Sequence, residues 1–496
     1  MSELPKGWVA TELGKIAQVV GGSTPKNSSD SSNFQQNGIP WITPSDLTGY
    51  TKTYISRGKR DLSQKGFISC GTKKLPKGSV LFSSRAPIGY CVIANNEVCT
   101  NQGFKSFVPF EGIIPEYLRY YLITSKNYIE SVASGTTFKE ISASRIATIP
   151  IPLPPLNEQR RIVAKLDRLF ARSRCAREEL GRVSGLVQRY KQAILAAACS
   201  GRLTADWREQ NPSVESALDF LERIQKEREK RYKGEILELK TQGRSVPKLS
   251  EFQHKNSSGY IPRNWVSISV ESACLFIVDC PHSTPKFISE GEYCVDTTSI
   301  EPRKIVWSKV RKVSKEEFVE RTSRMLPSKG DIIFSREGTI GTVVRIVNDP
   351  SFCLGQRMMM FRFSPLILPE YAELYLQSSI FIDQYEPLII GTSSPHLNIG
   401  AIRKMSFSVP PLNEQKEIVK RVERLFKTID LIEQEHQKAS KLLDRLEQAT
   451  LSKAFRGELV PQDPNDEPAA VLLERIQSDR QAQPKRKAIK SKQSHR

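Results

Sequence analysis

The chain has 496 residues, of which 39% are hydrophobic and 26% charged, a composition typical of a globular protein too long for a single core. Its formal net charge of +20 favours a polyanionic partner, and nucleic acid is the first candidate. The nine cysteines include no Cys-x-x-Cys pair, and no long apolar run or signal-like segment occurs. These absences argue against a disulfide or zinc framework, export or membrane insertion, so we expect a cytoplasmic protein of two or more domains.

The first region, residues 1–155, mixes short β-branched runs with turns rich in Gly, Pro, Asn and Ser. Strands are predicted at Ser79–Ser83, Tyr90–Ala94 and Phe104–Pro109, and a helix beginning with proline in its first turn at Pro115–Ile123. Turns this frequent exclude a helical bundle. The region is therefore predicted to be a compact domain of mixed α/β type.

The next stretch, PLPPLNEQRRIVAKLDRLF at residues 152–170, returns as SVPPLNEQKEIVKRVERLF at residues 408–426. Prolines before each copy disfavour helix upstream, and Asn157 and Asn413 suit an N-cap. A match of this length is an internal repeat. We predict two long helices, over residues 156–200 and 412–457.

Both helices carry apolar residues at heptad spacing, which is typical of a coiled coil. Neither stripe can be buried by its own helix, so we expect the two to pack against each other, antiparallel, with one globular domain at each end. The predicted interface residues are Ile162, Leu166, Leu169, Leu180, Val183, Val187, Ile194, Ile418, Val422, Leu425, Ile429, Ile432, Leu443 and Leu446.

The rest of the chain repeats this order. A connector with a short charged helix (Ala217–Lys230) covers residues 201–259. Residues 260–411 then repeat the first domain. STPK at 283–286 matches STPK at 23–26, and PEYAELYL at 369–376 matches PEYLRYYL at 115–122. Residues 458–496 hold a second connector helix and a basic tail. The overall fold class is α+β, with two domains joined by two long antiparallel helices in a pseudo-two-fold internal repeat. Duplex DNA has an axis of the same kind, so two unlike domains suit two unlike half-sites.

Motifs for catalysis are missing from the sequence. There is no Walker-type phosphate loop, no Gly-x-Gly-x-x-Gly and no Asn/Asp-Pro-Pro-aromatic tetrapeptide. Asp296, Glu301 and Lys304 have the wrong spacing for a metal nuclease, and the five histidines are scattered. This pattern predicts a binding subunit with no catalytic residues and no cofactor or metal of its own.

Three motifs carry a family resemblance: the doubled PPLNEQ entry, GTTFKEIS at 135–142, and the Ala-x-x-Gly-Arg/Glu-Leu exits at 198–203 and 454–459. With the repeated LERIQ of the connectors and the basic tail, the chain resembles the specificity subunit of type I restriction–modification systems, in particular the enteric K-type branch. The resemblance implies two target recognition domains that read a bipartite, asymmetric double-stranded DNA site, with the helices as a ruler. It also implies docking of two modification subunits, which methylate adenine with S-adenosylmethionine, and of two restriction subunits, the translocase–nucleases, for which ATP and magnesium are implied.

Candidate DNA contacts come from comparing the two domains. Features that both share are expected to be scaffold or phosphate contacts, and features that differ are expected to read bases. The shared candidates are Thr24, Lys26, Gln102 and Thr136 in the first domain and Lys286, Gln356 and Thr392 in the second. The differing candidates are Arg85, Lys139, Arg336, Arg357 and His396. They come from aligning Ser84-Arg85 with Arg336-Glu337, Gly103 with Arg357, and Phe138-Lys139-Glu140 with Ser394-Pro395-His396. Gln102 and Gln356 have the chemistry to read adenine but equally suit an amide that braces a turn.

A second hypothesis is a coiled-coil adaptor that joins two protein-binding domains, with the basic charge incidental. Salt separates the two, because a protein that neutralises many phosphates loses DNA affinity steeply as salt rises.

Overall fold

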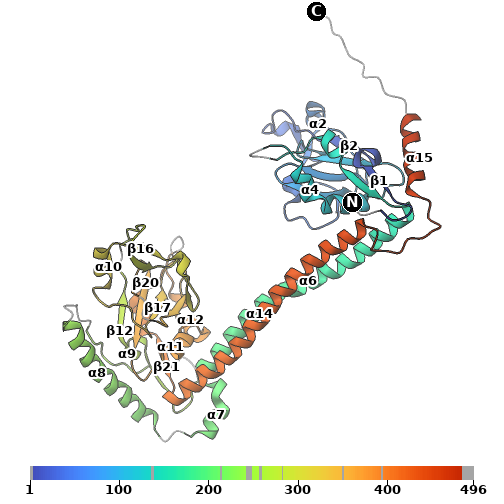
Figure 1. Cartoon of the computed structure of the whole chain (residues 1–496). Helices are drawn as coiled ribbons and strands as arrows, with labels where there is room; N and C mark the ends of the chain where they lie inside the picture. Colours follow the sequence, from blue (N-terminus) through green and yellow to red (C-terminus); the bar gives the residue numbers. More distant parts are fainter. Residues whose placement is uncertain are drawn as a thin grey trace, which may run out of the picture. The chain divides into compact units, whose positions relative to one another are not determined.

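The computed structural model describes residues 4–135, 139–212, 215–241, 248–255, 260–281, 283–348, 351–391 and 395–482. The chain divides into two compact units: unit 1 is Met1–Leu180 with Gln437–Arg496, and unit 2 is Gly181–His436. Each unit contains one mixed domain and a part of each long helix (Figure 1). The units are described one at a time below.

The domain of unit 1 is built on a five-stranded sheet in the order β2-β9-β6-β7-β4, beside a three-stranded sheet in the order β5-β3-β8. β1 (Val9–Glu12) pairs antiparallel with β10 (Pro150–Leu153), so the start and the end of the domain meet. The other strands are β2 Ala17–Gly21, β3 Phe34–Ile42, β4 Tyr54–Ile55, β5 Arg60–Leu62, β6 Val80–Ser84, β7 Ile88–Ala94, β8 Cys99–Thr100 and β9 Lys105–Pro109. The helices are α1 Leu13–Ile16, α2 Gln64–Cys70, α3 Pro115–Thr124, α4 Lys126–Ser131 and α5 Ala143–Ala147.

The core of unit 1 is shared between the domain and the long helices. Phe82, Phe107 and Tyr117 are fully buried in one cluster with Ile162 of the first long helix and Ala454 of the second. A proline at the first position starts α3, and its Tyr117, Leu118, Tyr120 and Leu122 face this core. The domain therefore uses the helix pair as part of its own interior.

Unit 2 repeats this topology, which confirms the predicted internal repeat and the α+β class. The sheet order β12-β20-β17-β18 corresponds to β2-β9-β6-β7, β16-β13-β19 corresponds to β5-β3-β8, and the pair β11-β21 corresponds to β1-β10. The strands are β11 Val266–Ser269, β12 Cys274–Asp279, β13 Glu292–Val295, β14 Ile300–Glu301, β15 Lys304–Ile305, β16 Arg311–Val313, β17 Ile332–Ser335, β18 Val343–Arg345, β19 Phe352–Leu354, β20 Met358–Phe363 and β21 Ser406–Val409. The helices are α9 Val270–Ala273, α10 Lys315–Thr322, α11 Pro369–Leu376, α12 Ser379–Tyr385 and α13 Ile399–Lys404.

The long helices are α6 (Leu156–Cys199) and α14 (Leu412–Phe455), each of 44 residues. In unit 1, Arg177 Nη1 lies 2.8 Å from Asp444 Oδ1, and Ser173 donates a hydrogen bond to Glu447. In unit 2, Lys191 Nζ lies 3.0 Å from Glu433 Oε1. Rising numbers on α6 (173, 177, 191) meet falling numbers on α14 (447, 444, 433), so the two helices run antiparallel, as predicted.

The heptad stripe is buried only in part. Of the predicted interface residues, Ile162, Leu166, Val187, Ile194, Ile418, Val422 and Ile429 are buried, and Leu169, Leu180, Val183, Leu425 and Leu443 are half-buried. Ile432 and Leu446 are 46% and 58% exposed, and Leu446 lines an apolar hollow with Leu169 and Leu443. The buried positions belong to cores that the domains complete. Burial is therefore full where a domain supplies a third layer, and two helices alone leave the flanks of the stripe in solvent.

Both helices begin at the predicted residues, and α6 and α14 end one and two residues earlier than predicted. α6 and α14 begin at Leu156 and Leu412, so Asn157 and Asn413 lie inside the first turn and do not serve as N-caps. Instead the carbonyl of Pro155 accepts a hydrogen bond from Gln159 N at 2.9 Å. Asn157 donates to Asp466 of the C-terminal connector at 3.3 Å.

The connector helices cover the domains. After α7 (Ala205–Gln210), α8 spans Ala217–Thr241, longer than predicted, and buries Phe220 and Ile224 in the core of unit 2. α15 (Ala469–Ala482) buries Leu472 and Ile476 in the core of unit 1 and lies beside that domain in Figure 1. The repeated LERIQ segment thus does the same work in both units. Among the described helices, none is long and apolar enough to cross a membrane.

Candidate DNA-contact surface

The repeated Asn-Glu-Gln motif attaches each domain to its long helix. In unit 1 the indole Nε1 of Trp8 donates to Glu158 Oε2 at 2.9 Å, and in unit 2 Trp265 Nε1 donates to Glu414 Oε2 at 2.9 Å. Both carboxylates are buried. The matched tryptophans and glutamates therefore make one junction twice.

The glutamine that follows completes this junction. Gln159 accepts a hydrogen bond from Ile114 N at 3.0 Å, and Gln415 accepts from Leu368 N at 2.8 Å. Ile114 and Leu368 are the N-caps of α3 and α11. Each helix start is thus tied to its domain by buried polar groups, which tolerate little displacement.

The two junctions differ in charge. Glu414 also accepts from Thr204 at 2.7 Å and is paired with Arg208, whereas Glu158 accepts from the uncharged Gln462 at 3.2 Å. Burial raises the pKa of Glu158, although the hydrogen bonds from Trp8 and Gln462 oppose the rise. The first junction is therefore sensitive to the protonation of its carboxyl group.

Three loops of unit 1 meet at one edge of its sheets. Ser84 N at the end of β6 donates to Gly103 O at 2.8 Å, and Ile141 N donates to Ser84 O at 3.1 Å. The loop after β2 joins them, since Ser23 N donates to Thr100 O at 2.9 Å. These bonds bring Thr24, Arg85 and Gln102 together, from three distant parts of the sequence.

Unit 2 has the same frame. Arg336 N donates to Arg357 O at 3.1 Å, and Leu397 N donates to Arg336 O at 2.8 Å. The positions of Ser84 and Gly103 in unit 1 thus correspond to Arg336 and Arg357, as the repeat alignment predicted. The hydroxyl of Thr284 donates to Gln356 Oε1 at 3.1 Å. We call these matched edges, formed by the loops after β2, β6 and β8 in unit 1 and after β12, β17 and β19 in unit 2, the recognition edges.

The arginines of the recognition edges are paired with carboxylates. Arg85 lies 3.7 Å from Glu140, which also takes Lys105 at 3.2 Å. Arg357 pairs with Glu337 at 3.2 Å and is 45% exposed. An exposed ion pair of this kind contributes little to stability, so another anion could replace the carboxylate at small cost.

Arg336 does not suit the base contact predicted for it. Its side chain is only 10% exposed and its Nε lies 3.1 Å from Asp279 Oδ1. Breaking a buried ion pair leaves an uncompensated charge, which costs roughly 3–5 kcal/mol. Arg336 therefore supports the fold of the recognition edge. The more exposed pair of Arg357 and Glu337 lies beside it on the surface of the edge.

The remaining candidates lie on or next to the edges. Lys26 and Lys139 are exposed, and Lys139 Nζ donates to Glu130 O at 3.4 Å. Lys286 N donates to Glu317, and the exposed His396 exchanges backbone hydrogen bonds with Ile390. Thr136 and Thr392 lie outside the described residues.

Several residues of these edges were not predicted. Trp41 Nε1 donates to Ser23 O at 3.2 Å in unit 1, and Arg321 Nη2 donates to Ser283 O at 2.9 Å in unit 2. Glu140 and Glu337 pair with the arginines. Glu140 and Glu337 lie in stretches that differ between the repeats, so the repeat comparison could have identified them. Trp41 and Arg321 are not equivalent positions of the repeat, so no signal in the sequence indicated their role.

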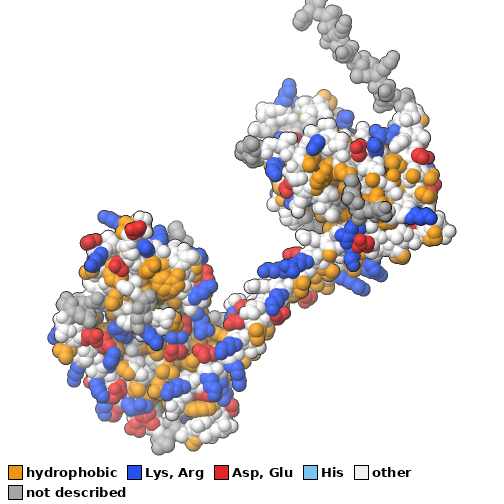
Figure 2. Space-filling view, in the orientation of Figure 1, with side chains coloured by type: hydrophobic (Ala, Val, Ile, Leu, Met, Phe, Trp, Pro, Cys, Tyr) orange, Lys and Arg blue, Asp and Glu red, His pale blue; other side chains and the backbone are white. Residues whose placement is uncertain are grey.

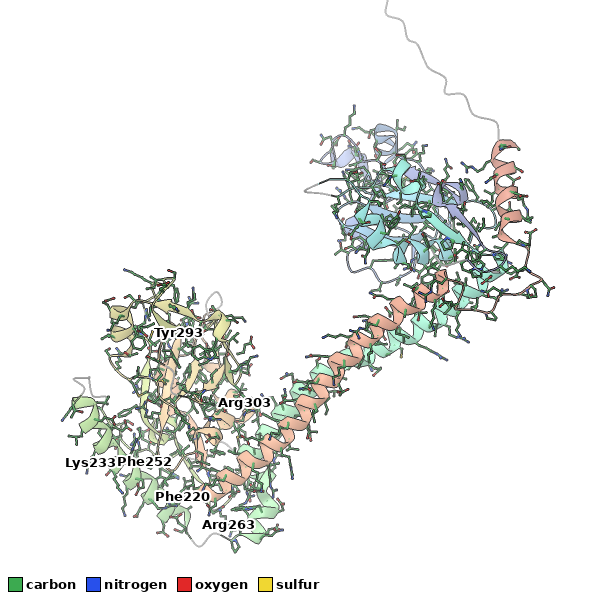
Figure 3. The ribbon with its side chains drawn as sticks, in the orientation of Figure 1. Phe220, Lys233, Phe252, Arg263, Tyr293 and Arg303 are labelled. Atoms are coloured by element: carbon green, nitrogen blue, oxygen red, sulfur yellow. The ribbon has the colours of Figure 1, made fainter. Side chains whose placement is uncertain are left out.

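Aromatic and basic side chains also gather on the small sheet of unit 2. Tyr293, 44% exposed, lies 5.7 Å from the ring of Trp307, and Lys312 lies 5.5 Å above Tyr293. Figure 3 labels Tyr293 on this part of the domain and Arg303 near α14, where it stacks over Phe426 at 5.4 Å. Figure 2 shows Lys and Arg side chains spread among acidic ones over both units, without a single uniform basic face in this view.

Within the residues that the structure describes, no group of three or more His, Cys, Asp or Glu side chains is placed to hold a metal ion. The nine cysteines are free thiols. The recognition edges carry hydrogen-bond donors and cations on loops that backbone hydrogen bonds hold together.

Comparison with known proteins agrees with this geometry. The family model "Type I restriction modification DNA specificity domain" matches residues 5–180 and 229–441. The EcoBI specificity subunit of Escherichia coli is 26% identical over 98% of this chain and 95% of its own length, and the EcoKI specificity subunit of E. coli strain K12 is 25% identical over 99% of each chain. The MjaIX specificity subunit of Methanocaldococcus jannaschii is 41% identical over 169 aligned residues, which are 34% of this chain and 38% of that protein. Specificity subunits are the non-catalytic component of type I restriction enzymes.

Solved structures share the fold. A chain from a study of complex assembly and conformational transition of the type I R-M system matches with a TM-score of 0.64 at 18% identity, over 92% of this chain and all of that one. The HsdS subunit of Thermoanaerobacter tengcongensis matches with a TM-score of 0.52 at 18% identity, over 92% and 98% of the two chains. With a family model that matches most of its residues and a fold shared with solved subunits, this chain belongs to the family of type I restriction–modification specificity subunits.

Proposed function

We propose that the chain reads a bipartite, asymmetric double-stranded DNA target, with one half-site for each recognition edge. The observation that carries the proposal is the doubled edge. In both units an equivalent backbone hydrogen bond joins the loops after β6 and β8, or after β17 and β19, and a threonine–glutamine hydrogen bond joins the loop after β2 or β12 to them, while the exposed side chains differ. A common frame suits contacts to the DNA backbone, and unlike side chains suit unlike bases. The net charge of +20 supports a DNA partner.

The helices act as a ruler between the half-sites in this proposal. α6 and α14 are continuous over 44 residues each and are tied to their domains by the buried Trp–Glu and Gln junctions. At 1.5 Å per residue each helix is roughly 65 Å long. A stiff element of this kind would hold the spacer at a constant length while its bases go unread.

The same helices dock two modification subunits. In unit 2, Leu186, Tyr190 and Leu431 on the helix pair are more than half exposed, and in unit 1 Leu442 and Leu446 are also exposed. Next to Leu446 an apolar hollow of about 250 Å³ lies between α6 and α14. Apolar side chains gathered on a two-helix surface favour burial against a protein partner.

The chemistry belongs to the partners. The modification subunits would bind S-adenosylmethionine and methylate one adenine in each half-site, and two translocase–nuclease subunits would use ATP and magnesium. We place the complex in the cytoplasm, where its reduced cysteines are stable.

The decisive experiment is to express the chain with its modification subunits in a strain without adenine methylation and to map the methylated adenines. We expect a single motif of two specific parts separated by unread positions, with one methylated adenine in each part. A contiguous motif, or methylation without sequence preference, would contradict the proposal.

Two further measurements separate DNA reading from an adaptor role and test docking. The logarithm of the binding constant for the mapped duplex should fall linearly with the logarithm of the salt concentration, and a flat dependence would favour the adaptor. Replacing Leu186 and Leu431 with Ser should weaken assembly with the modification subunits, whereas the exposed Gln188→Ser on the same helix serves as the control. Equal assembly by both variants would contradict docking on this surface.

A further inference from the structure

The exposed apolar side chains of the long helices occur twice. The starts of α6 and α14 are 256 positions apart in the sequence, so residues with this separation are equivalent. Leu186 of unit 2 is equivalent to Leu442 of unit 1, and these side chains are 55% and 59% exposed. Tyr190 and Leu446 are equivalent in the same way, at 53% and 58%. We call each pair, Leu186 with Tyr190 and Leu442 with Leu446, a docking ridge, an arrangement suited to two copies of one partner.

The two helices also meet in the same register at both ridges. In unit 1, Arg177 Nη2 lies 3.2 Å from Glu447 Oε1. The equivalent positions hold Glu433 and Lys191, and in unit 2 Lys191 Nζ lies 3.0 Å from Glu433 Oε1. The same ion pair therefore joins the helices in each unit, with its charges exchanged. The side chains around the two ridges can thus be compared position by position.

Beside the ridge of unit 1, small side chains leave the helix pair open. The hollow of about 250 Å³ between α6 and α14 is lined by Leu446 of the ridge and by Leu169 and Leu443. Ser173 and Ala176 are the smallest side chains of its lining. The space is therefore a consequence of two small residues at positions where the seam of a helix pair usually carries large apolar ones.

Unit 2 carries larger residues at the same positions. Ile429 and Ile432 stand where unit 1 has its serine and alanine. Ile429 is 1% exposed and packs in the core of unit 2 with Ile194, which stands where Thr450 lines the hollow of unit 1. Unit 2 therefore supplies its own branched aliphatic side chains at the place that is open in unit 1.

This difference indicates what fits the hollow. The hydroxyl of Ser173 already donates to Glu447, whose carboxylate is also paired with Arg177, so these polar groups need no ligand. A volume of about 250 Å³ lies below the roughly 300–1,000 Å³ of pockets for drug-sized molecules. Burying an aliphatic group there is favourable, and the isoleucines of unit 2 show that such a group suits the place. The chemistry is that of an aliphatic side chain from a protein partner.

We propose that the hollow of unit 1 receives an aliphatic side chain of the modification subunit that docks on the ridge of that unit. Both modification subunits are copies of one chain, so the same side chain meets Ile432 at the ridge of unit 2 and stays outside the helix pair. The two matched ridges therefore hold identical partners with unequal affinity, and unit 1 is the tighter site. This inference rests on the proposed docking of two modification subunits.

The test titrates the modification subunit into the full chain and counts the bound copies by native mass spectrometry. We expect two binding steps of unequal Kd for the wild type. Ala176→Ile gives unit 1 the residue that unit 2 carries, and it should raise the Kd of the tighter step roughly ten- to a hundredfold, the range for burying one aliphatic side chain. The control is Ala171→Ile, which adds the same group at an exposed alanine of α6 outside the hollow and should change neither step.

The opposite change gives an independent test in unit 2. Ile432→Ala opens the equivalent place there and should lower the Kd of the weaker step by roughly three- to tenfold, a part of the same burial effect because Ile429 stays in place. If Ile432 served only as an apolar contact, its truncation would raise this Kd, and that result would overturn the inference.

Three other results would also decide against the inference or against its premise. Equal steps for the wild type, or an Ala176→Ile chain that binds both copies as the wild type does, would overturn it. A self-dimer of the chain that Ala176→Ile abolishes would assign the hollow to a second copy and overturn it as well. A wild-type chain that binds no modification subunit would instead contradict the proposed docking itself.

Discussion

The two Trp–Glu junctions should respond differently to the same substitution. Glu414 and Glu158 accept equivalent indole hydrogen bonds, but only Glu414 is paired with a cation, Arg208. We therefore compare Glu414→Gln with Glu158→Gln, changes that keep a side-chain oxygen for the indole and remove the negative charge. Each variant is the matched control of the other.

Removing one partner of a buried ion pair costs roughly 3–5 kcal/mol. The side chain of Arg208 is 19% exposed, so water recovers part of its charge and we expect Glu414→Gln to cost unit 2 about 2 kcal/mol. Glu158 has no cation among its hydrogen-bond donors, and burial already raises its pKa. We expect Glu158→Gln to change the stability of unit 1 by no more than about 0.5 kcal/mol at neutral pH.

The pH dependence of stability gives a second test of the first junction. Because the folded pKa of Glu158 is raised, its protonated form favours the folded state, and the wild type loses stability as the pH rises from about 4 through the folded pKa. Glu158→Gln should remove this part of the pH dependence from unit 1. Hydrogen exchange in urea, read by mass spectrometry, reports the two units separately. Equal losses in both variants, or a larger loss for Glu158→Gln, would refute this account of the junctions.

Three other predictions concern the domains and the helices. Exchanging residues 1–155 for the corresponding domain of another specificity subunit should change one part of the methylated motif only, and a change in both parts would defeat modular reading. Inserting seven residues at matched places in α6 and α14 adds about 10 Å, so the mapped spacer should lengthen by about three base pairs with both specific parts unchanged; altered specific bases would count against a ruler. Leu166 is fully buried and Leu186 is 55% exposed. In urea unfolding, Leu166→Ala should therefore lower the free energy of unfolding by roughly 2–5 kcal/mol and Leu186→Ala by less than about 0.5 kcal/mol. Similar losses would show that the helix pair is not part of the core.

Much of the architecture could be predicted because the chain contains its own comparison. The PPLNEQ repeat and its heptads predicted both long helices to within a few residues. β6, β7, β9 and α3 lie close to where the β-branched runs and a proline start placed them. Helix and strand periods are local properties, so a single sequence carries them. Matching the repeats also predicted that Gly103 and Arg357 occupy equivalent places, which the backbone hydrogen bonds confirm.

The contacts between distant residues were decided only by folding. Glu158 and Glu414 are buried acceptors for tryptophan, and Arg336 is held in a buried ion pair with Asp279. Each of these contacts joins side chains from segments far apart in the chain. The same holds for Trp41 and Arg321, which hold equivalent serines without any likeness in sequence. Burial and hydrogen bonding are properties of the packed molecule, and many residue types can satisfy one geometric need. The amino-acid order thus determined which elements form and that they form twice, while tertiary packing determined which polar groups support the fold and which remain exposed to solvent.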